Sequence, residues 1–120
     1  MPAVPAFMLK KLFVKGSLKN NLEGFEFQLK NVLAPGTITG VLPLVVDDQA
    51  YQAESLYIIQ SEERRAANQI GKEQPFSFAL NSQLTMAVRG PQLPPGAHRI
   101  VIDVITKEAG ELKWDVTETL

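Results

Sequence analysis

The sequence predicts an all-β protein: an antiparallel two-sheet β-sandwich of the immunoglobulin-like class, with about seven to nine short strands. Hydrophobic residues recur with a period of two along most of the chain, which is the spacing of half-buried strands. Segments rich in Asn, Asp, Gly and Pro separate these runs at short intervals and are typical of tight turns. No long amphipathic helix pattern is present. An OB-like closed barrel is the second interpretation of the same pattern.

Composition limits the classes of protein to consider. The chain has 120 residues, of which 45% are hydrophobic, and this predicts one domain with one core. It has no cysteine, which excludes disulfides and thiolate zinc sites and makes an oxidising compartment a less favoured location. No apolar run approaches the roughly 18 residues of a membrane span. We therefore expect a cytoplasmic protein with no membrane partner, built as a flexible leader over 1–7 and a single domain over 8–120.

The net charge is −1, which is unlike the strongly basic footprint of a nucleic-acid-binding protein. The first 30 residues contain five lysines and two glutamates, which give a local charge of +3, and the charges of the rest of the chain sum to −4. Solvated strand faces, or charge complementarity between copies of the chain, explain this asymmetry better than a nucleic-acid partner.

The first strand pair is expected around the turn at 20–24. Before the turn, apolar positions alternate with lysines over 11–19, and after it Phe25, Phe27 and Leu29 alternate with polar residues. This pattern predicts a hairpin that buries its phenylalanine face.

The next strand is expected over 37–46, after the turn at 34–36. Both of its faces are largely apolar, and Pro43 favours a sheet edge or a bulge at which Gly40 permits a bend. Asp47 and Asp48 then form a tight turn; a calcium or catalytic site is disfavoured because no further carboxylate lies at ligand spacing. Short strands over 49–51 and 55–60 complete this part.

Residues 61–75 lack strand patterning. Ser61 before Glu62 and Glu63 is a fair helix N-cap, and Gly71 is a fair helix end, so this segment is expected to hold about two helical turns at most. A mobile loop that lines a site and a solvated connector are the two functional alternatives.

The last third returns to strand patterns. Alternation over 76–78 and 83–89 precedes a turn, and a final hairpin pairs 98–104 with 112–116, with Trp114 on the inward face.

A proline-glycine corner opens that final hairpin. Pro95 and Gly96 form the turn, and His98, the single histidine, begins the strand. We interpret His98 as a structural tether like the polar aromatic residue of a tyrosine corner. A single histidine also excludes multi-histidine metal centres, and neither a nucleophile elbow nor a glycine-rich phosphate loop is present. The sequence therefore assigns no catalytic residue, no cofactor and no metal ligand.

Apolar residues on the strand faces opposite the expected core predict an interaction surface. Together they are too many for scattered exposure on a monomer. The candidate interface residues are Phe13, Val41, Val45, Tyr57, Ile59, Val101 and Ile105. The alternative is a carbohydrate or small-ligand module that uses exposed tyrosines, with Tyr51 and Tyr57 as the candidate contacts. A small hydrolase is the least favoured interpretation, and we expect the chain not to be catalytic on its own.

Three segments resemble the small β-sandwich subunits of bacterial C-glycoside deglycosidases and their uncharacterised relatives. They are Gly24-Phe25-x-Phe27, the strand end Val45-Val46-Asp47-Asp48 with Tyr51 beyond it, and Leu93-x-Pro95-Gly96-x-His98 before an alternating strand. The resemblance spans most of 8–118 and implies a non-catalytic small subunit that packs on a larger catalytic partner. It carries over no catalytic residue. Independently of the resemblance, the candidate interface residues predict association as a homo-oligomer or as the accessory subunit of a larger enzyme.

Overall fold

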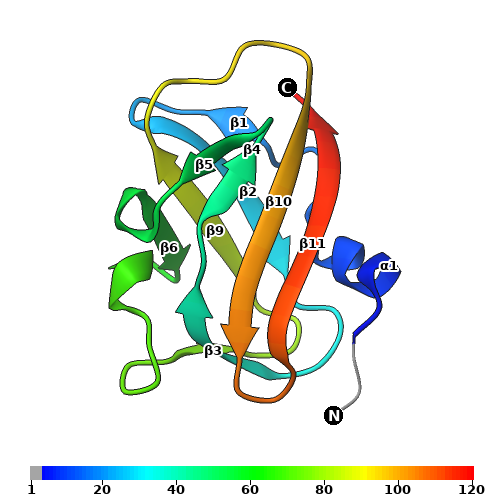
Figure 1. Ribbon diagram of the computed structural model, residues 1–120, viewed down its shortest axis with the longest axis vertical. Coiled ribbons are helices and arrows are strands. Elements are labelled where there is room, and N and C mark those ends of the chain that lie inside the picture. The colour runs from blue at the N-terminus through cyan, green and yellow to red at the C-terminus, as the bar shows by residue number, and fades with distance from the viewer. Residues whose placement is uncertain (1–3) are drawn as a thin grey trace.

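The chain folds as two antiparallel β-sheets packed face to face, which confirms the all-β sandwich predicted from the sequence. The computed structural model describes residues 4–120 (Figure 1). The first sheet has five strands in the order β1 (Lys19–Asn20), β2 (Gly24–Lys30), β9 (Gln83–Arg89), β6 (Leu56–Gln60) and β7 (Glu63–Ala66).

The second sheet is organised around one long strand, β10 (Ala97–Thr106). Its partner β11 (Gly110–Thr119) pairs with it along its whole length, from Ala97 opposite Thr119 to Thr106 opposite Gly110. Two shorter strands pair with different parts of β10, and each has one further neighbour: β4 (Leu44–Val46) with β5 (Gln49–Tyr51), and β3 (Gly36–Val41) with β8 (Phe76–Phe78). β10 and β11 run side by side across the sandwich (Figure 1).

Alternating side chains from both sheets fill the space between them, as the period of two requires. Trp114 is 4% exposed, which confirms its predicted inward position. The largest fully buried side chains are Phe25, Phe27, Leu56, Ile58, Leu84, Ile100 and Ile102.

The expected strand over 11–19 is wrong except at its end. The chain instead forms helix α1 (Ala6–Leu9) and a 3-10 turn, η1 (Lys10–Leu12), before the two-residue strand β1. Leu12 and its neighbour Phe13 are both buried, whereas a regular strand would turn one of the two side chains outward. Phe13 is buried because its ring stacks on Phe27, with ring centroids 5.2 Å apart. Of the expected leader 1–7, residues 1–3 lie outside the described part and Val4 packs against the core.

The segment 37–46 forms two strands, β3 and β4, where one was expected. Leu42 and Pro43 separate them, and the register of β3 against β10 shifts between Ile105 and Thr106. This shift is the bulge that Gly40 predicted, and the Ile105 side chain lies directly over Gly40, 3.2 Å from where a β-carbon would stand. The split raises the strand count above the seven to nine expected.

The helical expectation for 61–75 is also wrong for its first half. Ser61 and Glu62 have φ values of 49° and 72° and form the two-residue turn of a hairpin between β6 and β7. This turn lacks the glycine or asparagine that normally signals it, so the sequence pattern concealed it. A 3-10 turn, η3 (Ala67–Gln69), follows, and Ala67 and Ile70 anchor it in the core.

Candidate functional site

The candidate interface residues do not form one surface. Phe13 is buried, and Val41 lies opposite buried Val104 and packs against the core, so both expectations of an outward position are wrong. The bulge in β3 reverses the alternation that the sequence implied for Val41. Tyr57 and Ile59 lie on the outer face of the five-stranded sheet, whereas Val45, Val101 and Ile105 lie on the outer face of the other sheet.

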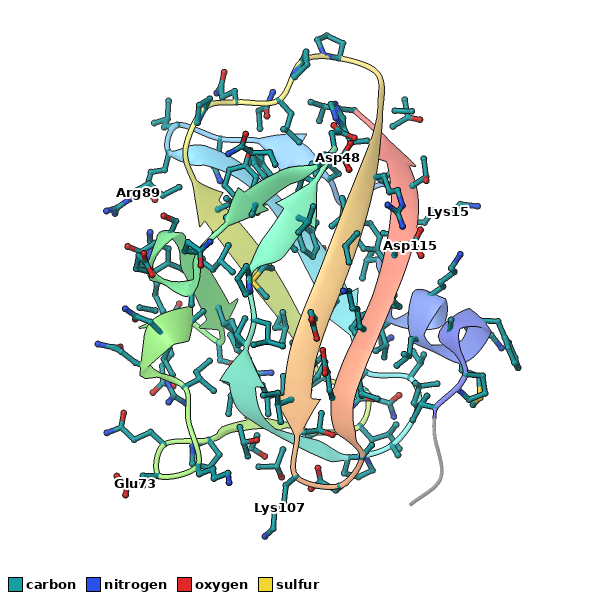
Figure 2. All side chains as sticks on the ribbon, viewed as in Figure 1. Lys15, Asp48, Glu73, Arg89, Lys107 and Asp115 are labelled. Carbon is teal, nitrogen blue, oxygen red and sulfur yellow. The ribbon has the colours of Figure 1, made fainter. Side chains whose placement is uncertain are left out.

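The outer face of the second sheet carries an apolar patch, which we call the β10 face and define by Val45, Val101, Asp103 and Ile105. Val45 and Val101 are directly opposite each other on β4 and β10. Ile105 is 36% exposed and covers Gly40 of β3. Around these apolar residues the β11 strand supplies charges, and Lys107 projects from the turn that joins β10 to β11 (Figure 2). An apolar centre with a charged rim is the usual anatomy of a protein interface.

Asp103 lies within this patch, between Val101 and Ile105 along the outer side of β10. Its Oδ1 atom is buried and has no hydrogen-bond partner. Burial, together with the nearby carboxyl of Glu111, raises the pKa of Asp103 to about 6, and Lys113 on the facing strand offsets only part of that rise. A buried acceptor without a partner is costly.

An ion pair borders the patch at one side. Arg99 on β10 donates from Nε to Asp115 Oδ2 on β11 over 3.1 Å, and this hydrogen bond lowers the pKa of Asp115. Figure 2 shows Asp115 beside β11. Asp115 at the border of the β10 face therefore has a partner, whereas Asp103 within the face has one oxygen without a hydrogen bond.

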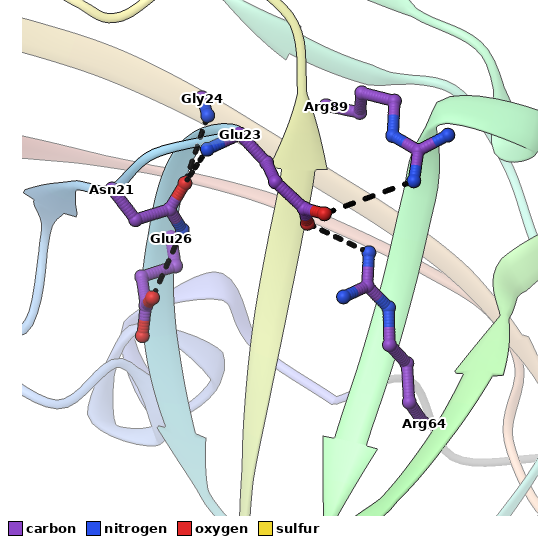
Figure 3. Close-up of polar contacts among 6 residues, drawn as sticks. All are labelled: Asn21, Glu23, Gly24, Glu26, Arg64 and Arg89. Atoms are coloured by element: carbon purple, nitrogen blue, oxygen red, sulfur yellow. Dashed lines mark hydrogen bonds and ion pairs between the residues drawn. The ribbon is translucent and has the colours of Figure 1, made fainter.

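The opposite face of the sandwich carries a polar cluster around Tyr57. The Arg64 guanidinium lies over the Tyr57 ring at 4.2 Å from its centroid, and that of Arg89 lies at 5.2 Å. Glu23 accepts a hydrogen bond from Arg64 Nη2 over 2.9 Å and lies 3.8 Å from Arg89, as the dashed contacts of Figure 3 show. A sugar ring would have to displace Arg64 to stack on Tyr57.

The Glu23 carboxylate is held in place by its turn. Asn21 Oδ1 accepts from the backbone N–H groups of Glu23 and Gly24 over 2.9 and 2.8 Å, and its Nδ2 donates to Glu26 over 3.0 Å (Figure 3). Gly24 is required here, because a β-carbon would stand 2.2 Å from the Val88 carbonyl oxygen.

The second candidate ligand tyrosine is not a free surface side chain. Tyr51 packs its ring edge-to-face against buried Phe25, with centroids 5.5 Å apart, and belongs to the partly buried layer around the core. Partial burial raises the pKa of the Tyr51 hydroxyl. This placement offers no exposed ring for stacking on a sugar.

The corner at Pro95 and Gly96 places His98 between two acceptors. His98 is 5% exposed; its Nε2 lies 2.7 Å from the Pro94 carbonyl oxygen and its Nδ1 contacts Asp47 Oδ2. Asp47 and Asp48 form the predicted tight turn, with φ values of 50° and 69° between β4 and β5. The Asp47 hydrogen bond raises the pKa of His98 and lowers that of Asp47, and Asp47 Oδ1 also accepts from the Arg99 N–H. The corner is thus a closed set of hydrogen bonds.

Sequence reasoning missed Asp103 and the arginines around Tyr57. The sequence does indicate the unusual position of Asp103, because the pattern Val101-x-Asp103-x-Ile105 places one carboxyl between two apolar residues on the same strand face. No sequence pattern indicates the contact of Arg64 with Tyr57, because the turn of the β6–β7 hairpin that brings them together lacks the usual turn residues.

Over 4–120 no group of three or more His, Asp or Glu side chains could hold a metal ion. No helix within the same residues is long and apolar enough to cross a membrane.

No curated protein sequence matches the chain. The sequence model of the family described as "Hydroxymethylglutaryl-CoA reductase, N-terminal domain" matches residues 8–120, which is nearly the whole chain. The chain therefore belongs to the hydroxymethylglutaryl-CoA reductase N-terminal domain family.

Proposed function

We propose that this chain is a non-catalytic docking domain that uses the β10 face to bind the catalytic part of a hydroxymethylglutaryl-CoA reductase. The observation that carries the proposal is the family match over 8–120, because the family's name describes one domain of a larger enzyme. The resemblance to the small subunits of C-glycoside deglycosidases implies a role of the same kind and stays a prediction.

Of the two outer sheet faces, the β10 face is the better candidate for docking. Its apolar side chain Ile105 is exposed and Val45 and Val101 are half-buried, whereas Tyr57 on the other face already holds Arg64 over its ring. The Asp103 carboxyl lies among these apolar side chains. The partner that fits is therefore a protein surface with an apolar ridge and an arginine or lysine directed at Asp103.

The test is direct binding between this chain and the catalytic part of the reductase from the same source, measured by isothermal titration calorimetry. We expect saturable binding that the variant Val101→Lys weakens by about tenfold or more, since central apolar residues carry most of the affinity of an interface. Lysine at this position faces Asp115 across the strands, so the variant should fold. The matched control is Thr85→Lys, on the outer face of the other sheet, which should bind like the wild type.

Three outcomes would contradict the proposal. The first is no binding by the wild-type chain, and the second is equal weakening by both lysine variants. The third is a stable homodimer in light scattering that Val101→Lys dissociates, because the β10 face would then be covered by a second copy.

A further inference from the structure

An apolar cavity lies between the two sheets, at the end of the sandwich where β10 turns into β11. Its volume is about 160 Å³. Both sheets and the N-terminal segment contribute lining side chains, among them Leu29, Ile38, Met86, Val104, Leu112 and Trp114. An engineered protein cavity of about 150 Å³ with a similar lining stays dry and binds benzene. The cavity here is therefore large enough for a molecule the size of one six-membered ring.

The cavity reaches the protein surface, so a ligand can enter without unfolding the sandwich. Ala34, Pro35 and Glu108 belong to its lining and are exposed to solvent. Glu108 is the charged residue of the lining, and its carboxylate accepts a hydrogen bond from the Thr37 N–H over 2.8 Å. A carboxylate at the opening disfavours anionic ligands such as fatty acids and favours neutral ones.

One lining residue has a hydrogen-bond donor without a partner. Trp114 is 4% exposed, and its indole Nε1 makes no hydrogen bond. The Nε1 atom is itself enclosed, so a ligand in the cavity would contact the Trp114 ring and not the N–H. The other buried polar residue of the lining, Asn31, already donates to the carbonyls of Ala34 and Phe78 and accepts from Leu33 and Ala34.

A water molecule is a poor occupant of this space. A buried water needs two to four polar partners, and the lining offers almost entirely carbon. A small apolar molecule matches this lining.

We propose that this cavity binds a small neutral apolar molecule of about six to ten non-hydrogen atoms. Cyclic hydrocarbons and cyclic ketones belong to this class. The site is separate from the β10 face, so the proposal does not depend on docking to a catalytic partner.

The chain carries its own probe, because Trp114 is its single tryptophan. Its indole N–H gives one isolated cross-peak in a ¹H–¹⁵N correlation spectrum, which can be followed while cyclohexanone is added. We expect a saturable shift with a dissociation constant on the order of 0.1–1 mM, as for good fragment-sized ligands. Methylenecyclohexane, which has the same shape and no oxygen, should bind at least as tightly, because the lining is almost entirely carbon. Cyclohexanecarboxylate should bind more weakly than either, because of Glu108.

A substitution that fills the opening of the cavity tests whether the ligand binds there. Gly36 lines the cavity, lies opposite buried Phe78, and has open space where a β-carbon would stand, so Gly36→Leu should fill the opening without strain. Gly71→Leu is the matched control: it makes the same change in an equally open position of a distant loop. We expect Gly36→Leu to abolish the shift and Gly71→Leu to preserve it.

The proposal is overturned if the wild-type cross-peak does not shift saturably up to about 10 mM cyclohexanone, ten times the weakest affinity expected. It is equally overturned if both leucine variants respond alike. Should Gly36→Leu fail to fold, Ala109→Phe in the turn at the opening makes the same test.

Discussion

Replacing Asp103 with Asn should stabilise this protein at neutral pH. A folded-state pKa of about 6, against 3.8 for an ordinary carboxyl, means that ionisation of Asp103 opposes folding. The difference is equivalent to about 3 kcal/mol at 1.36 kcal/mol for each pH unit. Solvent screening at this partly exposed position reduces the expected effect to about 1–2 kcal/mol.

The sign of the pH dependence follows from which state holds the proton. Below pH 3.8 the carboxyl is neutral in both the folded and the unfolded chain, so Asp103→Asn should match the wild type. As the pH rises through about 6, the wild-type chain must ionise a buried carboxyl and loses stability that the variant keeps. The advantage of the variant is therefore complete only above that range.

The assay is urea unfolding followed by Trp114 fluorescence at pH 4, 5.5 and 7.5, with thermal melts in parallel. At pH 7.5 a gain of 1–2 kcal/mol corresponds to a rise in Tm of about 4–8 °C for a chain of this length. Asp115→Asn is the matched control, because Arg99 lowers the pKa of Asp115; this variant should lose a few tenths of a kcal/mol at pH 7.5.

Two results would refute the reasoning. Destabilisation of Asp103→Asn at pH 7.5 would mean that the ionised carboxyl is stabilised by its surroundings. An equal gain at pH 4 and pH 7.5 would mean that the effect comes from packing and not from the proton.

Three further substitutions probe the fold. His98→Ala should cost about 1–3 kcal/mol, because it leaves the Pro94 carbonyl without its donor. Since the pKa of His98 is raised, this loss should be full below pH 6.5 and should shrink as the pH rises further, which unfolding at pH 6 and 9 would show; an equal loss at both would contradict a charged histidine. Gly24→Ala should cost more than about 2 kcal/mol, because its methyl group would meet the Val88 carbonyl; a neutral effect in thermal melts would refute that contact. Phe27→Ala should cost about 3–5 kcal/mol by urea unfolding, and a loss below 1 kcal/mol would exclude its central place in the core.

The period-two pattern predicted much of the fold because sheet burial is a local property. Phe25, Phe27 and Trp114 are buried as their alternation indicated. The prediction of a strand over 11–19 was wrong, because stacking of Phe13 on Phe27 outweighed the strand preference of this lysine-rich segment. The β6–β7 hairpin was missed because its turn residues, Ser61 and Glu62, are not usual for that turn.

The candidate surface was only partly predictable. Val45, Val101 and Ile105 were chosen by alternation and do share one face. Tyr57 was chosen by the same reasoning and lies on the other side of the sandwich, since alternation tells inward from outward and does not tell which sheet a strand joins.

The sequence by itself determined that this chain is an all-β sandwich with a phenylalanine-rich core, because strand periodicity and turn chemistry act between neighbours along the chain. Only the tertiary structure decided that Asp103 is partly desolvated, that Arg64 lies over Tyr57, and that a cavity remains beside Trp114. Each of these depends on residues far apart in sequence that meet when the strands pair. Desolvation, cation–π contact and packing voids are properties of the assembled sheets, so no local pattern encodes them.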